Sequence, residues 1–145
     1  MEYAEQFERD FMQRTLTIVR EYQGQYDATM LLNCLLGLLI VPKEKSIEKI
    51  PNDPISELGR WGISPGSIKR FGKCECGHRH PETLRQLVKS MRNAIAHFRI
   101  DPVHENRKVS GFKFTDRSGF HAVVKLSEVQ EFVSKLAAHI EQQHA

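Results

Sequence analysis

The side chains best suited to chemistry in this sequence are Arg92, Asn93 and His97, which lie within one short stretch. Cleavage of RNA by its own 2′-hydroxyl needs a base, an acid for the 5′-oxygen and positive charge beside the phosphate. An imidazole titrates near neutrality and can perform either proton transfer. A guanidinium keeps its proton and presents a planar fork to phosphate oxygens. We therefore expect His97 to transfer protons, Arg92 to stabilise charge, and Asn93 to orient His97 or hold a phosphate oxygen, without a metal.

One histidine in each chain supplies only one of the two proton-transfer groups that this reaction uses. Two copies of His97 across a two-fold axis would supply both, because a symmetric interface brings identical patches together. The motif therefore favours a homodimer. In the structural alternative, His97 is a solvated residue on a polar helix face and Arg92 packs its stem against apolar neighbours.

The element that must position these side chains is a helix predicted over Pro81–Ile100. Its apolar residues recur at steps of three and four and form one stripe: Leu84, Leu87, Val88, Met91, Ile95 and Phe98. At about 100° per residue, Asn93 and His97 fall within about 40° of each other, nearly opposite the stripe. Arg92 lies about 140° from His97 and must reach round by its length.

Two further helices are predicted before this one, over Glu2–Tyr22 and Ala28–Val41. The second is apolar nearly all round but shorter than the about 20 residues of a membrane span, so we expect a buried central helix. Asn33 interrupts it, and a buried amide needs hydrogen-bond partners. It could bond to the backbone, or it could hold Arg92 or Asn93 or line the active cleft.

The segment Arg92-Asn93-Ala94-Ile95-Ala96-His97 resembles the R-N-x-x-x-H signature of the HEPN superfamily (higher eukaryotes and prokaryotes nucleotide-binding domain). Residues 32–44, LNCLLGLLIVPKE, are similar to a signature of a bacterial, often plasmid-borne, HEPN subgroup. The resemblance implies a helical bundle that acts as a dimeric, metal-independent endoribonuclease with a toxin or defence role. It also allows a neutralising antitoxin protein as a partner. The alternative is a non-catalytic HEPN-like module that binds nucleotide or another protein.

Between Lys43 and His80 the chain is rich in proline and glycine, so long helices are excluded there. Its cations alternate with Trp61 and Phe71, which is typical either of a solvated loop or of a groove that binds RNA phosphates and stacks a base. Ile63 and Trp61 are expected to tether this excursion to the rest of the molecule. The candidate substrate-binding residues are Asn33, Arg70, Arg85 and Lys89.

The run CECGHRH, residues 74–80, places two cysteines and two histidines within one short segment. Zinc sites favour two or more residues between paired cysteines and a distant second pair, so these four ligands crowd one tetrahedron. We therefore expect a polar turn and no metal, with His78 or His80 free to contact substrate. The alternative is a zinc-stabilised regulator built on Cys74, Cys76, His78 and His80.

The C-terminal part changes character. Residues 108–115 and 120–126 alternate loosely around a turn at 116–119, which predicts a β-hairpin. A last helix follows, with its stripe at Val129, Phe132, Val133, Leu136 and Ile140. The predicted fold is mainly α: a HEPN-like helical bundle with a small C-terminal hairpin and a basic Pro/Gly-rich loop excursion.

Composition limits the remaining choices. A chain of 145 residues with 40% hydrophobic and 27% charged residues is expected to form a single globular domain over residues 1–145. The net charge of +3 permits RNA as a partner without requiring it. Acidic residues occupy the region where an apolar signal sequence would lie. Three cysteines argue against a disulfide framework, so we expect a cytoplasmic protein. Because its longest apolar run is too short for a membrane span, we also expect no membrane partner.

Overall fold

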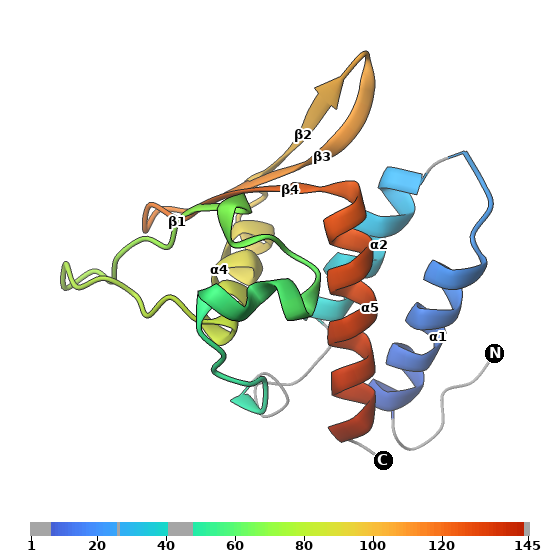
Figure 1. Cartoon of the computed structure of the whole chain (residues 1–145), viewed down its shortest axis with the longest axis horizontal. Helices are drawn as coiled ribbons and strands as arrows, with labels where there is room; N and C mark the ends of the chain where they lie inside the picture. The colour runs from blue at the N-terminus through green and yellow to red at the C-terminus, as the bar shows by residue number, and fades with distance from the viewer. Residues whose placement is uncertain (1–6, 26, 41–47, 144–145) are drawn as a thin grey trace.

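The structure is a computed structural model that describes residues 7–25, 27–40 and 48–143 (Figure 1). Its α-helices are α1 (Phe7–Glu21), α2 (Asp27–Ile40), α4 (Leu84–Ala96) and α5 (Leu126–Gln143). Two 3₁₀ helices, η1 (Ile55–Trp61) and η2 (Pro65–Ser67), precede the first strand. The strands are β1 (Ile68–Arg70), β2 (Ile100–Glu105), β3 (Lys108–Thr115) and β4 (His121–Lys125).

The four strands form one antiparallel sheet in the order β1-β4-β3-β2. The buried side chains of the two central strands alternate: Phe112, Phe114, Ala122 and Val124 are buried, whereas Lys113, Thr115, His121 and Val123 are only partly so. These residues pair as Phe112 with Val124 and Phe114 with Ala122, so they form one apolar face. Helices α2, α4 and α5 contact this sheet and cover that face, and α1 packs outside against α5 (Figure 1).

The predicted mainly α-helical bundle is therefore wrong, because the fold is mixed α/β around a four-stranded sheet. The predicted hairpin exists as β3 and β4, but β1 and β2 extend it on both sides. Strand β2 is an edge strand, which is where Pro102 is tolerated. Its turn to β3 uses Asn106 and Arg107, which have φ values of 52° and 68°. Arginine is unusual at such a position, so the sequence carried no turn signal.

The early helices lie close to their predicted ranges. Met12, Thr15 and Val19 of α1 are buried, whereas Phe7 and Ile18 of the same helix are about half exposed. Tyr3 and residues 41–47 lie outside the described part of the chain. Among the described helices, none combines the length and the apolar character that crossing a membrane requires.

Ile63 and Trp61 anchor the Pro/Gly-rich excursion to the core, as expected. Ile63 is fully buried, and the Trp61 Nε1 donates to Asp53 at 3.0 Å while its ring meets His139 of α5 edge-on. Phe71 is also buried and packs against Phe120. Because Phe71 is only 6% exposed, we no longer expect it to stack on a base.

The carboxylate of Glu128 joins the excursion to the first turn of α5. It accepts hydrogen bonds from the backbone N–H of Ser64 (2.7 Å), the Ser67 hydroxyl (2.9 Å) and the backbone N–H of Lys125 (3.0 Å). A negative charge in the first turn also suits the helix dipole. One side chain therefore fixes how η2 and β1 enter the sheet.

We expect Glu128→Ala to lower the free energy of unfolding by about 2–4 kcal/mol, because three donors lose a charged acceptor. The measurement is urea denaturation followed by circular dichroism. Glu131→Ala, at an exposed position on the same helix, is the matched control and should change stability by less than about 0.5 kcal/mol. Equal losses in the two variants would show that the hydrogen bonds of Glu128 contribute little.

Candidate nucleic-acid interface

Helix α4 is the rod that carries the Arg92–His97 motif. It begins after Thr83, whose hydroxyl accepts from the backbone N–H of Gln86 at 3.3 Å and caps the helix, so Pro81 lies outside it. Of the predicted stripe, Leu84, Leu87, Val88 and Met91 are buried and Ile95 is partly buried; Ser90 and Ala94 are buried on the same helix without having been predicted. This face holds the helix against α2 and β3. The opposite side therefore presents the motif.

The helix ends at Ala96, four residues before its predicted end. The backbone N–H of His97 donates to Asn93 at 3.2 Å, and that of Arg99 donates to Ala94 at 2.8 Å. Between them Phe98 adopts a left-handed φ of 54° and turns the chain into β2. Phe98 was expected in the buried stripe, but it is 95% exposed. His97 is thus the C-terminal cap of α4, and its exposed side chain stands at the turn between helix and sheet.

Asn93 and His97 both line a cleft of about 640 Å³, here called the His97 cleft. Its other wall comes from the loop before α4 and from the β3–β4 turn, which contribute Lys73, His80 and Arg117. The carboxylate of Asp116 also lies in this cleft, but it accepts from the backbone N–H groups of Ser118 and Phe120 within the turn. Glu75 adds a second carboxylate, so two histidines, two cations and two carboxylates surround one opening.

A second cleft of about 430 Å³, the Arg92 cleft, lies on the other side of Asn93. Arg92 and Lys89 line it together with the apolar residues Ile40 and Ala96. The Nε of Arg92 is buried and finds no hydrogen-bond partner among residues 7–25, 27–40 and 48–143. A buried guanidinium donor without a partner is uncommon in a folded protein.

A third cleft of about 440 Å³, the Arg70 cleft, continues the same surface. The His97 cleft and the Arg70 cleft share Lys73, His80 and Ser118. The His97 cleft and the Arg92 cleft share Asn93. The three clefts together hold more cations than carboxylates; the cations are Lys69, Arg70, Lys73, Arg79, Lys89, Arg92 and Arg117. One continuous basic surface thus runs from α4 to β1.

The field of these cations reaches His121 on β4. Burial lowers the pKa of His121, and the nearby charges of Lys113, Arg70 and Lys69 lower it further. These residues lie on the sheet face that α2, α4 and α5 leave uncovered, where His121 pairs with Thr115 and Arg70. The cations of β1 and β3 therefore make this uncovered face of the sheet positive.

The sequence-predicted site residues do not all meet. Arg92 and His97 line different clefts of one chain, with Asn93 between them. Lys89 lies beside Arg92, and Arg70 lies in the third cleft, where its Nε donates to the carbonyl of Gly119 at 3.2 Å. Within one chain, Asn93 is the residue that the Arg92 cleft and the His97 cleft share.

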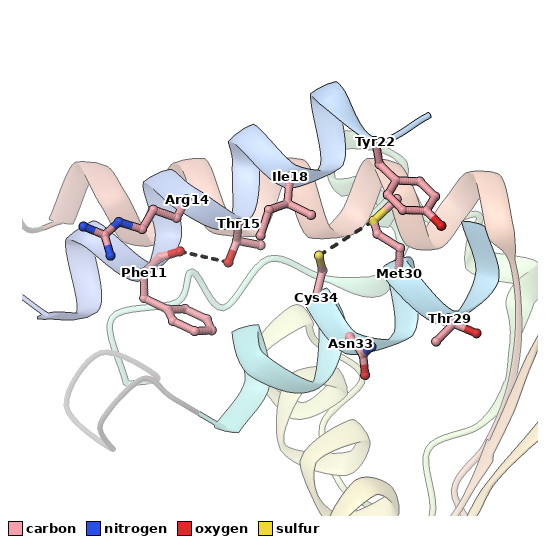
Figure 2. Close-up of a pocket in the computed structure, with 9 residues that line it drawn as sticks. All are labelled: Phe11, Arg14, Thr15, Ile18, Tyr22, Thr29, Met30, Asn33 and Cys34. Atoms are coloured by element: carbon pink, nitrogen blue, oxygen red, sulfur yellow. Dashed lines mark hydrogen bonds between the residues drawn. The ribbon is translucent and has the colours of Figure 1, made fainter. Parts of the chain in front are cut away.

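Arg85 and Asn33 are placed away from this surface. Arg85 donates from Nε and Nη2 to the carbonyl of Ile50, so it braces the preceding loop. Asn33 was expected to be buried, but it is exposed and lines a separate apolar pocket of about 440 Å³ between α1 and α2. Figure 2 shows Cys34 and Met30 pointing from α2 toward α1, whereas the side chain of Asn33 points away from α1.

Cys74 and Cys76 are joined by a disulfide, although the odd number of cysteines argued against a disulfide framework. The bond spans a separation of two residues and connects no two elements, so it is a local feature of one loop. Cys34 is a free, buried residue, and burial raises the pKa of its thiol. His78 lies beside the disulfide, with its Nδ1 at 3.2 Å from the Sγ of Cys76.

Arg117 is the one cleft cation that sequence reasoning missed. It lies in the β3–β4 turn, which looked like a simple reversal between strands. The only signal available was that a basic residue occupied that turn, because the turn reaches the motif only once β3 packs on α4. His80, proposed as a substrate contact from sequence, does line the same cleft as His97.

Comparison with known proteins gives one result that covers the whole chain. Searches of curated proteins and of solved structures gave no significant match. A family model described as HEPN pEK499 p136 matches residues 1–145, which include the motif on α4. The HEPN resemblance deduced from Arg92–His97 is therefore confirmed, and this chain belongs to the HEPN pEK499 p136 family.

Proposed function

We propose that this protein is a metal-independent endoribonuclease in which His97 transfers protons and Arg92 stabilises the charge on the phosphate. The observation that carries the proposal is the position of Asn93 and His97 in a cleft bordered by Lys73, His80 and Arg117. An imidazole beside fixed cations supplies the groups that attack by a 2′-hydroxyl requires. Membership of the HEPN family makes a nucleotide-binding or RNase-type module the natural setting for these groups.

The proposed enzyme is a homodimer that joins two copies of the motif. Because Arg92 and His97 of one chain line different clefts, a second copy is a direct way to bring them to one phosphodiester. Two of the large apolar side chains that are exposed, Ile40 at 50% and Phe98 at 95%, flank the motif. Apolar side chains at the edge of a polar site favour self-association there.

The basic surface gives the proposed substrate its path. A single strand of RNA that lies along the Arg92, His97 and Arg70 clefts would meet cations throughout its length, and such contacts release counterions. Phe71 and Trp61 are both engaged in the core, so recognition on this surface is expected to rest on the backbone phosphates. A toxin or defence role and an antitoxin that covers these clefts would follow from such an activity.

The test is incubation of the purified protein with single-stranded RNA in excess EDTA. We expect cleavage to continue and to leave a 2′,3′-cyclic phosphate, because the 2′-hydroxyl is the nucleophile. RNA that carries one 2′-deoxynucleotide should remain intact at that position, which makes it the matched control. Loss of cleavage on chelation, cleavage at the deoxy position, or intact RNA with tight binding would overturn the proposal. The last result would favour a non-catalytic HEPN-like binding module.

His121 provides a readout of RNA contact that does not depend on cleavage. We expect a bound, uncleavable 2′-deoxy oligonucleotide to raise the pKa of His121, because its phosphates offset the charges of Lys113, Arg70 and Lys69. The measurement is an NMR titration of the imidazole with and without the oligonucleotide. High salt should abolish the difference, because it screens these contacts. An unchanged pKa at low salt would place the oligonucleotide elsewhere.

A further inference from the structure

We propose that Cys74, Cys76 and His78, once the disulfide is reduced, form a binding site for a soft divalent metal ion such as Zn²⁺. Their donor atoms, two Sγ and an Nδ1, all lie within 4.8 Å of one another. Tetrahedral zinc with bonds of about 2.3 Å to sulfur and 2.0 Å to nitrogen holds its ligand atoms about 3.5–3.8 Å apart. After reduction the two Sγ atoms must move apart, and rotation of the three side chains would bring the donors to these distances.

The backbone of this loop, residues 73–79, is held independently of the disulfide. The backbone N–H of Cys74 donates to His78 at 2.8 Å, and that of Gly77 donates to Cys74 at 2.9 Å. Gly77 adopts a φ of 86°, which returns the chain so that His78 faces the two cysteines. Lys73 and Arg79 pair across the base of the loop. The three ligands thus converge because the turn is tight, and the proposed site leaves out His80, so it does not need all four ligands in one tetrahedron.

The chemistry of the donors selects the ion. Two thiolates and one imidazole suit zinc and exclude calcium and magnesium, which prefer oxygen ligands. Cys76 and His78 are exposed and Cys74 is half-buried, so an ion can enter. Three protein ligands leave one position of the tetrahedron for water. The positive charges of Lys73 and Arg79 in the same loop offset the two negative thiolates.

The site would act on the clefts through the loop that carries it. Lys73 and His80 flank the three ligands in sequence and line both the His97 cleft and the Arg70 cleft. An ion bound here would hold the wall of both clefts without taking part in RNA cleavage. The disulfide and the metal-bound form exclude each other, because a disulfide sulfur is no thiolate.

The test uses the whole chain and Co²⁺ as a spectroscopic probe for Zn²⁺. A water-soluble phosphine supplies two electrons to the disulfide, and water supplies the oxygen of the resulting phosphine oxide and the two protons of the thiols. Each thiol then loses its proton to bind the ion. We expect visible cobalt bands and a thiolate-to-cobalt charge-transfer band that saturate at one ion per chain and disappear when Zn²⁺ is added. The oxidised protein should show neither band.

Variants separate this site from other sources of binding. Cys76→Ser and His78→Ala should each weaken Co²⁺ binding by at least about a hundredfold, since a direct ligand contributes no less than an outer-shell partner. Cys34→Ser removes the buried thiol outside the loop and should bind as wild type does. Circular dichroism checks that each variant is folded. The proposal is overturned if reduced wild type shows no charge-transfer band, or if His78→Ala binds as tightly as wild type.

This result is independent of the proposed RNA cleavage. The oxidised protein has no thiolates for the ion, so the cleavage assay in EDTA can be run without reductant and is unaffected by this site. Metal binding with no RNA cleavage would leave the site in place and remove the enzyme. Cleavage with no metal binding would do the reverse.

Discussion

His97→Ala is expected to lower the rate of RNA cleavage by about 10²–10⁴-fold, the contribution typical of a general acid or base. The side chain is exposed at the end of α4 and lines the His97 cleft, so its removal takes away proton transfer without opening the core. The cations of the three clefts remain. RNA affinity should therefore change little, and the loss should appear in single-turnover rates at saturating protein.

His104→Ala is the matched control for this experiment. His104 is an exposed histidine on β2 and lines none of the three clefts, so its removal should leave the cleavage rate as it was. If both variants cleave RNA at the wild-type rate, His97 is only a solvated cap of its helix. The assignment of the active site to α4 would then be lost.

Mixing wild-type and His97→Ala chains tests whether two imidazoles act on one phosphodiester. If both are required, only dimers with two wild-type chains cleave, and an equal mixture retains about a quarter of the activity of all-wild-type protein. If each chain acts alone, the same mixture retains about half. The two outcomes differ enough for a simple titration of one variant into the other to separate them.

The elements with strong local patterns could be predicted from the sequence. The stripe of α5 is buried at the residues expected, including Phe132 and Leu136. Which face of a helix is buried follows from the apolar period of its own sequence over a few turns. The β3–β4 hairpin follows from alternation and from its turn. On α4, the helical period was enough to place Asn93 and His97 together on the exposed side.

The sheet as a whole could not be predicted, because its outer strands have no pattern of their own. β1 has three residues, and β2 contains Pro102 and buries none of its side chains. Both strands exist because β3 and β4 offer edges with free backbone groups. A non-local cause also explains why Phe98 is exposed although the helical period predicted it to be buried. The chain turns at Phe98 from α4 into β2, and the left-handed φ of this residue ends the helix there.

The candidate site shows the same division. Arg92, Asn93 and His97 share a helix, so spacing was enough to propose them. Arg117 and Lys73 come from segments on either side of α4 in the sequence, and only the packing of the sheet places them at the His97 cleft. The prediction that Asn33 is buried was wrong for a related reason. An apolar helix need not be covered on every side, and Asn33 lies on a side of α2 that is exposed to solvent.

The other large effect concerns Arg92, whose replacement by alanine is expected to lower the cleavage rate by about 10²–10³-fold. Its Nε is buried beside the Arg92 cleft without a hydrogen-bond partner in the described part of the chain, so the guanidinium can offer that donor to a phosphate oxygen. Arg92→Lys keeps the charge but loses the planar fork, and we expect it to recover only part of the rate. Single-turnover cleavage of one RNA by the three proteins is the measurement.

Lys89→Ala distinguishes stabilisation of the transition state from simple attraction of RNA. Lys89 lines the same cleft as Arg92 and carries the same charge without a planar fork. Its loss should therefore weaken RNA binding. It should also reduce the slope of log affinity against log salt concentration by about 0.7, the contribution of one phosphate contact on a single strand. Arg92→Ala should instead lower the rate at saturation. Two results would contradict this role: equal losses of rate and affinity in Lys89→Ala and Arg92→Ala, or full activity of Arg92→Lys. Arg92 would then act only as one more positive charge. Proton transfer by His97 would proceed without a residue dedicated to the phosphate.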